Sequence, residues 1–210
     1  MANQYKKVSD AVIKRLPRYF RYLADLKEAN VQRISSGALS EKMGLTASQI
    51  RQDFSCFGGF GQQGYGYNVE SLHNELRKIL GVDKGFNTII IGAGNLGQAI
   101  ANHSKFEKRG YFLKGIFDLD AKVIGKRING LEIMNMDRLP EFLKKEKADI
   151  AIITVPREVT AEVADLAARL GIKGIWNFSA MDIKVPDDVV VENVHLSDSI
   201  MVLGYRIKNN

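Results

Sequence analysis

The sequence predicts an α/β protein in which a helical N-terminal domain precedes a parallel-sheet domain and a C-terminal helix. Three observations support this prediction. Apolar residues recur at helical spacing near the N-terminus, strand-like and helix-like segments alternate from Phe86 onward, and a glycine-rich turn follows the first of these strands. The 210 residues suffice for one large or two small domains.

The composition is that of an ordinary globular protein and excludes several other classes. Hydrophobic residues make up 45% and charged residues 26% of the chain, which argues against disorder. A single cysteine excludes the secreted proteins held together by internal disulfides. We find neither a signal peptide nor an apolar run of the length that spans a bilayer. We therefore expect a soluble, cytoplasmic protein.

The excess positive charge is concentrated near the N-terminus. Residues 1–60 hold ten Lys and Arg against five Asp and Glu, a net charge of +5, whereas residues 61–210 hold twenty against nineteen, a net charge of +1. A basic face of this kind can bind a polyanion such as DNA. The alternative is a basic surface that is simply solvated.

The first sixty residues predict three helices. Apolar residues at helical spacing indicate a first helix, which Pro17 is expected to kink or split. A second helix is expected to follow Ser36 as its cap and to end at Gly44, and a third is expected to begin at Thr46, whose spacing to Gln49 is that of a capping box. Two short helices joined by a tight turn are typical of a helix-turn-helix.

A glycine-rich segment follows the third helix. It contains five glycines in nine residues, between positions 58 and 66, and they alternate with aromatic residues and glutamines. This pattern favours a β-hairpin, which would form the wing of a winged helix-turn-helix. Asn68 then caps a helix expected over Val69–Leu80, and residues 81–85 are the expected linker.

Strands and helices alternate in the remainder of the chain. Strands are expected at residues 88–91, 111–117, 149–155, 174–178 and 189–191, and helices at 95–106, 160–170 and 197–205. That order gives right-handed βαβ units and a parallel sheet. We therefore assign residues 1–84 to a winged-helix DNA-binding domain, 85–195 to a Rossmann-type dinucleotide-binding domain and 196–210 to a C-terminal helix.

A dinucleotide-binding motif opens the sheet domain. The pattern G-x-G-x-x-G follows a buried strand directly and opens a helix; its residues are Gly92, Ala93, Gly94, Asn95, Leu96 and Gly97. Gly92 permits the tight turn, Gly94 lets the backbone approach a pyrophosphate, and Gly97 allows close packing of helix on strand. The pyrophosphate would lie at the helix N-terminus, where free N–H groups and the helix dipole favour an anion.

Asp118 ends the second strand, where its carboxylate can accept hydrogen bonds from ribose hydroxyls and repel a 2′-phosphate. The motif therefore predicts NAD(H) rather than NADP(H), although Lys126 and Arg127 can partly offset the repulsion. Two later strands are expected to end at the same edge of the sheet, with Thr154-Val155-Pro156 and Asn177-Phe178. Because ligands bind at this edge, both segments are candidate walls of the nicotinamide pocket. Each is explained equally well as an ordinary strand end.

The sequence offers a cofactor site without the catalytic residues of a dehydrogenase. Too few residues follow the sheet to form a substrate domain. A dehydrogenase also needs a group that transfers a proton, and this group is usually a histidine. His73 is expected on a solvated helix face, His103 lies two turns from the phosphates, and His195 is the one candidate ligand neighbour. The single cysteine and the scattered histidines lack metal-ligand spacing. We expect a cofactor that is sensed, no bound metal and no enzymatic activity.

Several segments together carry a resemblance to a known family. They are Arg15–Tyr19, Arg51–Ser55, Phe57–Tyr67, Gly92–Gly97, Phe117–Asp118, Val155–Pro156 and Asn177–Ser179. In this order and over nearly the whole chain, the sequence resembles the Rex family, the redox-sensing transcriptional repressors of bacteria. The resemblance implies a homodimer that binds palindromic operator DNA when NADH is scarce and releases it when NADH binds. It also implies that the C-terminal helix is exchanged between subunits.

The chain departs from the family pattern at a few positions. The recognition helix of the family usually carries Arg-Lys-Asp-Leu-Ser, whereas this chain has Gln52 and Phe54 within that run. The family often has Tyr at the position of His103 and an Asp-aromatic pair at the position of His195-Leu196.

We predict three groups of DNA contacts, each of which could instead be a solvated side chain. Arg and Gln side chains can read base edges, so the third helix supplies the expected major-groove contacts Ser48, Gln49, Arg51 and Gln52. The expected phosphate contacts are Arg15, Arg18 and Ser36. The wing is expected to enter the adjacent minor groove with Gln62, Gln63 and Tyr65.

Two hypotheses from other classes stay open. A small NAD-dependent oxidoreductase with a helical appendage would turn over a substrate and would have no sequence-specific DNA affinity. A nucleotide- or CoA-binding interaction module would lose little NADH affinity in an Asp118→Ala variant.

Overall fold

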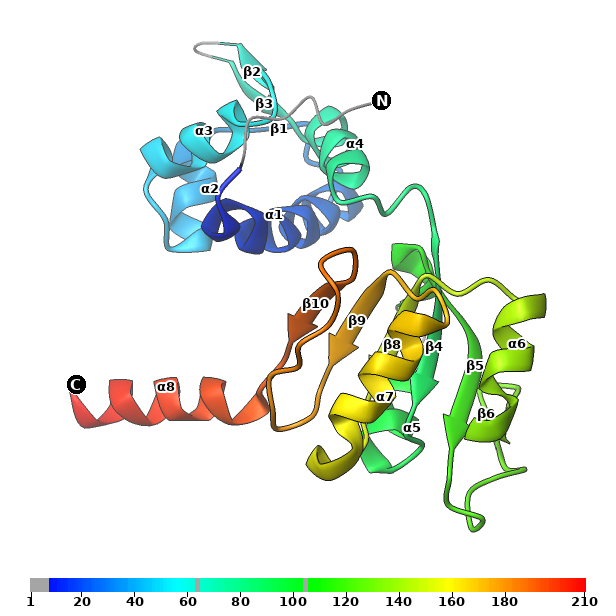
Figure 1. Ribbon diagram of the computed structural model, residues 1–210. Helices are drawn as coiled ribbons and strands as arrows, with labels where there is room; N and C mark the ends of the chain where they lie inside the picture. Colours follow the sequence, from blue (N-terminus) through cyan, green and yellow to red (C-terminus); the bar gives the residue numbers. More distant parts are fainter. Residues whose placement is uncertain (1–7, 63–64, 104–105) are drawn as a thin grey trace. The chain divides into compact units, whose positions relative to one another are not determined.

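The computed structural model of the chain describes residues 8–62, 65–103 and 106–210. The chain forms two compact units that divide in sequence between Lys84 and Gly85 (Figure 1). We call them the N-terminal unit and the sheet unit. Gly81 and Gly85 both have a positive φ, 68° and 72°, on either side of this boundary. Glycine adopts this left-handed conformation without steric cost.

The N-terminal unit consists of four helices and a small antiparallel sheet. Its elements are α1 (Asp10–Glu28), β1 (Arg33–Ile34), α2 (Ser36–Met43), α3 (Ala47–Ser55), β2 (Gly61–Gln62), β3 (Gly66–Asn68) and α4 (Val69–Ile79). The strand order is β1-β3-β2. Helices α2 and α3 form the predicted helix-turn-helix, and β2 with β3 forms the predicted wing.

Two local predictions for this unit were wrong. Helix α1 is not split at Pro17 but runs from Asp10 to Glu28, because a continuous apolar face of the helix, including Leu16 and Leu23, is buried. The cap of α2 is Ser35, not Ser36. Ser35 has an extended backbone, and its side chain accepts a hydrogen bond from the N–H of Ala38 at 3.0 Å, whereas Ser36 is already the first helical residue.

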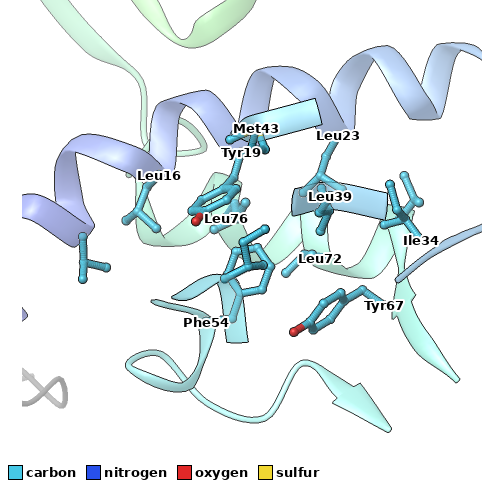
Figure 2. Close-up of a cluster of buried hydrophobic side chains, with 13 residues drawn as sticks. Leu16, Tyr19, Leu23, Ile34, Leu39, Met43, Phe54, Tyr67, Leu72 and Leu76 are labelled. Carbon is cyan, nitrogen blue, oxygen red and sulfur yellow. The ribbon is translucent and has the colours of Figure 1, made fainter. Parts of the chain in front are cut away.

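One apolar core holds the helices and the wing together (Figure 2). It collects fully or almost fully buried side chains from all four helices: Leu16, Tyr19, Leu23, Leu39, Met43, Ile50, Phe54, Leu72 and Leu76. Tyr67 of β3 joins the core and packs edge-on against Phe54, with 5.1 Å between the ring centroids. Each side chain of this size contributes about 1.5–3 kcal/mol when it is buried. The core therefore packs α3 against the other helices and the wing.

The sheet unit contains seven strands and four helices of four residues or more in its described part. Its elements are β4 (Phe86–Ile91), α5 (Asn95–Ala101), β5 (Tyr111–Asp118), β6 (Arg127–Ile128), β7 (Leu131–Asn135), α6 (Leu139–Lys145), β8 (Ile150–Ile153), α7 (Arg157–Arg169), β9 (Gly174–Asn177), β10 (Val190–Asn193) and α8 (Leu196–Lys208). The strand order is β10-β9-β8-β4-β5-β7-β6. All neighbours are parallel except β6, which pairs antiparallel with β7.

The six parallel strands have the order of a Rossmann sheet, with β4 as the first strand of the fold. Helices α6 and α7 pack on one face of the sheet and α5 on the other. The strand order reverses between β4 and β8, and in such sheets the ligand binds at the carboxyl ends of the strands at this reversal. The turn after β4 is the glycine motif.

Some elements of this unit differ from the prediction. The helix after the glycine motif ends at Ala101 rather than residue 106, because Asn102 and His103 are poor helix formers and Asn102 caps the helix. The strands β6 and β7 and the seven-residue helix α6 were not predicted. The C-terminal helix is longer than expected, and none of its residues is buried within this chain. No described helix is long and apolar enough to cross a membrane.

Candidate nucleotide site and nucleic-acid interface

The glycine motif has the backbone geometry that the sequence predicts. Gly92 has φ 104°, and a Cβ there would lie 2.8 Å from the Thr154 carbonyl. A Cβ on Gly97 would lie 1.9 Å from the carbonyl oxygen of Gly92, so Gly97 permits the close packing of α5 on the turn. Gly94, by contrast, is exposed and has no atom within 4 Å of the Cβ position. The motif is thus closed toward the protein and open at Gly94, where a pyrophosphate could approach.

Asp118 holds the glycine motif in place. One oxygen of its carboxylate accepts a hydrogen bond from the N–H of Ala93, and the other accepts one from the N–H of Asp120 at 2.8 Å. Each carboxylate oxygen has a further lone pair, so the partly buried group can still accept hydrogen bonds from ribose hydroxyls. The predicted ribose contact is compatible with this position, and the bond to Ala93 is a role that the sequence did not reveal.

Thr154 also stabilises the turn of the glycine motif through hydrogen bonds. Its hydroxyl donates to the carbonyl oxygen of Gly92 at 2.7 Å, and its N–H donates to the carbonyl of Ile91 at 2.9 Å. Val155 beside it is half-buried, and Pro156 is exposed just before α7. The structure therefore places these three residues at the reversal point of the strand order. Their contact with a nicotinamide stays a prediction.

Asn177 ends β9, and its contact with a nicotinamide stays a prediction. The residue is fully buried, and its side-chain amide donates to the carbonyl of Met181 at 2.7 Å and to Oδ1 of Asn193 at 2.8 Å. Its own Oδ1 accepts a hydrogen bond from the N–H of Ser179 at 3.0 Å. Asn177 thus connects the ends of β9 and β10, and its polar atoms are occupied within the protein.

The histidines have separate surroundings. His73 is not on a solvated face: its half-buried ring stacks on Phe20 with 4.5 Å between centroids. Burial and, to a lesser extent, the charge of Lys27 lower its pKa. His103 is exposed and packs edge-on against Phe106. His195 lies 3.1 Å from a carboxylate oxygen of Asp182. Among the described residues, no three His, Cys, Asp or Glu side chains are arranged to hold a metal ion.

Helix α3 presents a polar face to solvent. Ser48, Arg51 and Gln52 are exposed at positions i, i+3 and i+4, which lie on one side of a helix, whereas Ile50 and Phe54 are buried on the other side. Gln49 is half-buried, and its N–H donates to the side chain of Thr46 at 3.1 Å, which is the predicted cap. We call α3 the recognition helix, because it is the second helix of the helix-turn-helix.

Two of the predicted DNA contacts are bonded to each other. Arg51 donates through Nη1 to the hydroxyl of Ser36 at 2.9 Å, so α2 orients the Arg51 guanidinium while leaving it exposed. Arg18 is exposed on α1, as a phosphate contact requires. Arg15 is different, because its guanidinium binds Asp53 of α3 through two nitrogens, each at 2.7 Å. The sequence did not reveal this ion pair.

The wing is stabilised by a residue that sequence reasoning missed. Arg33 of β1 donates to the carbonyl oxygen of Tyr65 at 3.2 Å and lies over its ring, 5.9 Å from the centroid. Tyr65 is 69% exposed, as a DNA contact requires. Gln62 belongs to β2, and Gln63 lies outside the described residues.

Comparison with known proteins identifies the family. Residues 7–55 match a family described as "Putative DNA-binding protein N-terminus", and residues 83–181 match one described as "CoA binding domain". The chain is 60% identical over 201 residues to the redox-sensing transcriptional repressor Rex of Thermoanaerobacter pseudethanolicus, covering 96% of this chain and 90% of that protein. The chain belongs to the Rex family. Rex of Clostridium perfringens is 54% identical over 205 residues, which cover 98% of this chain and 97% of that protein.

Solved Rex-family structures have the same fold. The structure of the repressor RSP in complex with β-NAD⁺ and operator DNA is 58% identical, with a TM-score of 0.92 over 97% of this chain and 94% of that chain. The complex of RSP with β-NADH is 55% identical, with a TM-score of 0.90 over 97% and 96% of the two chains. These Rex relatives are named as repressors, which places the chain among regulators rather than enzymes.

Proposed function

We propose that this protein is a DNA-binding transcriptional repressor that senses the NADH/NAD⁺ ratio. The observation that carries the proposal is the presence in one chain of an exposed polar recognition helix and a glycine motif held by Asp118. A Rex-family relative of 58% identity is described as bound to both β-NAD⁺ and operator DNA. The protein binds its operator when NADH is scarce and releases it when NADH binds. It acts in the cytoplasm, where both ligands are found.

In the sheet unit, the glycine motif and Asp118 bind the dinucleotide. Gly94 leaves room for the pyrophosphate, the first N–H groups of α5 face its charge, and the Asp118 carboxylate accepts hydrogen bonds from the ribose. A 2′-phosphate would meet the negative charge of Asp118, so NADH binds more tightly than NADPH. Thr154, Val155 and Pro156 line the nicotinamide half of the site.

In the N-terminal unit, α3 enters the major groove. The exposed side chains Ser48, Arg51 and Gln52 read base edges, and the half-buried Gln49 lies beside them. Arg18 and Ser36 contact phosphates, and the wing with Gln62, Gln63 and Tyr65 enters the minor groove. The net charge of +5 on residues 1–60 favours this approach to DNA.

The protein acts as a homodimer that exchanges α8 between subunits. Seven large apolar side chains of α8 are each 51–70% exposed in the single chain: Leu196, Ile200, Met201, Val202, Leu203, Tyr205 and Ile207. An apolar surface of this extent indicates a partner. An Ile200→Asp substitution is expected to shift the protein toward monomers in sedimentation velocity, whereas Ser199→Asp on the same helix is the matched control and is expected to leave the dimer intact.

One observation favours a second candidate function. Residues 83–181 match a CoA-binding family, so the sheet unit could belong to a CoA-binding interaction module. This candidate requires CoA to bind more tightly than NADH and an Asp118→Ala substitution to leave NADH affinity nearly unchanged. Direct titration of both ligands by calorimetry distinguishes the two functions.

The proposal is tested by measuring DNA affinity against the NADH/NAD⁺ ratio. A duplex is first selected from random-sequence DNA by the protein, and its affinity is followed by fluorescence anisotropy at fixed salt. We expect the affinity to fall as the ratio rises at a constant total dinucleotide concentration. An affinity that ignores the ratio would contradict the sensor function, and failure to select any duplex would contradict the DNA-binding function.

A further inference from the structure

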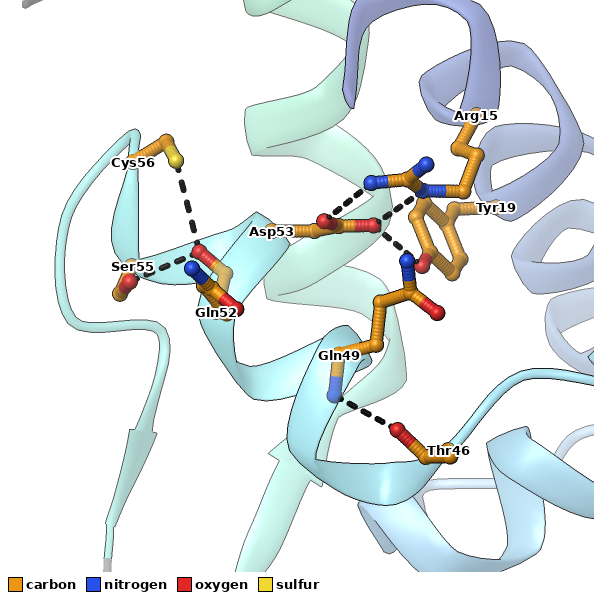
Figure 3. A network of polar contacts seen from close by, with 8 residues as sticks. All are labelled: Arg15, Tyr19, Thr46, Gln49, Gln52, Asp53, Ser55 and Cys56. Carbon is orange, nitrogen blue, oxygen red and sulfur yellow. Dashed lines mark hydrogen bonds and ion pairs between the residues drawn. The ribbon is translucent and has the colours of Figure 1, made fainter. Parts of the chain in front are cut away.

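The recognition helix is attached to α1 by a buried carboxylate. Asp53 of α3 is 1% exposed, and its two oxygens accept hydrogen bonds from Nε and Nη2 of Arg15, each at 2.7 Å (Figure 3). The hydroxyl of Tyr19 donates to the same carboxylate at 2.7 Å. A guanidinium that binds a carboxylate through two parallel hydrogen bonds forms one of the strongest and most directional polar contacts in proteins.

The position of Asp53 on α3 links this cluster to the DNA-facing side chains. Asp53 directly follows Arg51 and Gln52 in the sequence, but it is buried whereas both of them are exposed. Figure 3 shows its side chain pointing toward Arg15 and Tyr19 and away from Gln52. The contacts from α1 therefore hold the buried side of α3, while its polar side stays exposed to solvent. Arg15 and Tyr19 lie one turn apart on α1 and both donate to Asp53. Together they oppose rotation of α3 about its own axis and translation of α3 along that axis.

Arg15 and Tyr19 both keep their protons at physiological pH, so their hydrogen bonds to Asp53 persist. Burial, followed by the hydrogen bond to Asp53, raises the pKa of Tyr19, so its hydroxyl stays a donor over the physiological range. The hydrogen bond to Asp53 likewise raises the pKa of Arg15. The carboxylate of Asp53 balances the charge of the Arg15 guanidinium. Arg15 is therefore less available to a DNA phosphate than a solvated arginine would be.

We propose that Arg15 and Tyr19 are positioning residues that hold the recognition helix, through Asp53, in the orientation that discriminates operator from other DNA. The inference rests on the proposed DNA-binding function. It replaces the expectation that Arg15 contacts a phosphate. A phosphate contact strengthens binding to every sequence alike, whereas a positioning residue affects the ratio of affinities for specific and nonspecific DNA.

The first test compares Arg15→Gln with Arg18→Gln, which removes the same charge from an exposed position on the same helix. The probes are the duplex selected by the wild-type protein and a shuffled duplex of equal composition, titrated over a series of salt concentrations. Arg15→Gln removes the charge of Arg15 and at least one of its two hydrogen bonds to Asp53. We expect it to reduce discrimination on the order of tenfold, with an unchanged salt dependence. Arg18→Gln should weaken both duplexes alike and lower the slope of log K on log salt by about 0.9 for each subunit bound to the duplex.

A second set of variants guards against misfolding. Tyr19→Phe removes only a hydroxyl, and the double variant Arg15→Gln/Asp53→Asn replaces the ion pair by two amides without leaving an unpaired buried charge. Both should remain folded by circular dichroism, with discrimination reduced about threefold and about tenfold respectively. A simple contribution to stability would not alter discrimination in proteins that are fully folded.

Two results would overturn the inference. One is an Arg15→Gln variant that behaves like Arg18→Gln, with a lower salt slope and full discrimination. The other is a folded double variant that discriminates as well as the wild type. Both results leave the DNA-binding function intact, since the wild-type protein would still select its duplex. Failure of the wild type to select a duplex would instead reject the proposed function itself.

Discussion

The two units hold their functional groups by different means. In the N-terminal unit, polar and charged side chains do so: Asp53 binds Arg15 and Tyr19 behind the recognition helix. In the sheet unit, close backbone packing does so together with the side chains of Asp118 and Thr154: Gly92 and Gly97 pack so closely that neither site has room for a methyl group. The comparison predicts opposite sensitivities. The nucleotide site should fail when an atom is added, and the DNA site should fail when a charge is removed.

The largest effect is expected from Gly97→Ala. The new Cβ would lie 1.9 Å from a backbone oxygen that cannot move independently, so we expect the sheet unit to lose about 3 kcal/mol or more of stability and NADH binding to be lost. Thermal unfolding and NADH fluorescence measure both effects. Gly94→Ala is the matched control, because space surrounds that position: it should weaken NADH binding without loss of stability.

Asp53→Ala tests the other half of the comparison. Removal of the carboxylate leaves the partly buried Arg15 guanidinium and the Tyr19 hydroxyl without their acceptor, and we expect the N-terminal unit to lose about 2–3 kcal/mol. Urea unfolding followed by circular dichroism measures the loss. A stability equal to that of the wild type would show that the apolar core alone positions α3.

Asp118→Ala should have a smaller effect that is confined to ligand binding. The variant loses the bond to Ala93 and the expected ribose contacts, so NADH affinity should fall by about 1.5–3 kcal/mol while NADPH affinity falls less. Calorimetric titration of both dinucleotides provides the measurement. Equal losses for NADH and NADPH would show that Asp118 acts only through the glycine motif.

The smallest effect is expected from pH, and it should appear in the N-terminal unit. Burial lowers the pKa of His73 in the folded state, so the unfolded chain binds more protons. The stability contribution is fully present above the unfolded pKa of about 6.5 and is lost as the pH falls from there toward the folded pKa. Urea unfolding between pH 7.5 and 5 (roughly the range in which histidine titrates) should show the decline. His73→Gln, which does not titrate, should remove this part of it.

The features that could be predicted from the sequence are local ones. The glycine motif, the cap at Thr46 and the wing depend on residues within a few positions of one another, and all three are present as expected. Periodicity predicted most strands and helices for the same reason. It missed β6, β7 and α6, in which polar or charged residues and Pro140 interrupt every apolar run after two residues or fewer.

The features that could not be predicted depend on distant residues. Arg15 and Asp53 are 38 positions apart, and nothing near either residue indicates that the fold brings them together. The same holds for Asn177, whose partner Asn193 lies on the next strand of the sheet. A polar residue in a functional motif can therefore be a contact or a support, and the sequence alone does not separate these roles.

A sensor of this kind requires that dinucleotide binding in the sheet unit alters DNA binding in the N-terminal unit, and reciprocal linkage measures this coupling. If NADH weakens operator binding by some factor, the operator must weaken NADH binding by the same factor. Both factors can be obtained by titrating the selected duplex with and without saturating NADH, and NADH with and without saturating duplex, at one salt concentration. We expect two equal factors, each about fivefold or more. Affinities that do not change in either titration would show that the two units bind their ligands independently and that the protein is not a sensor.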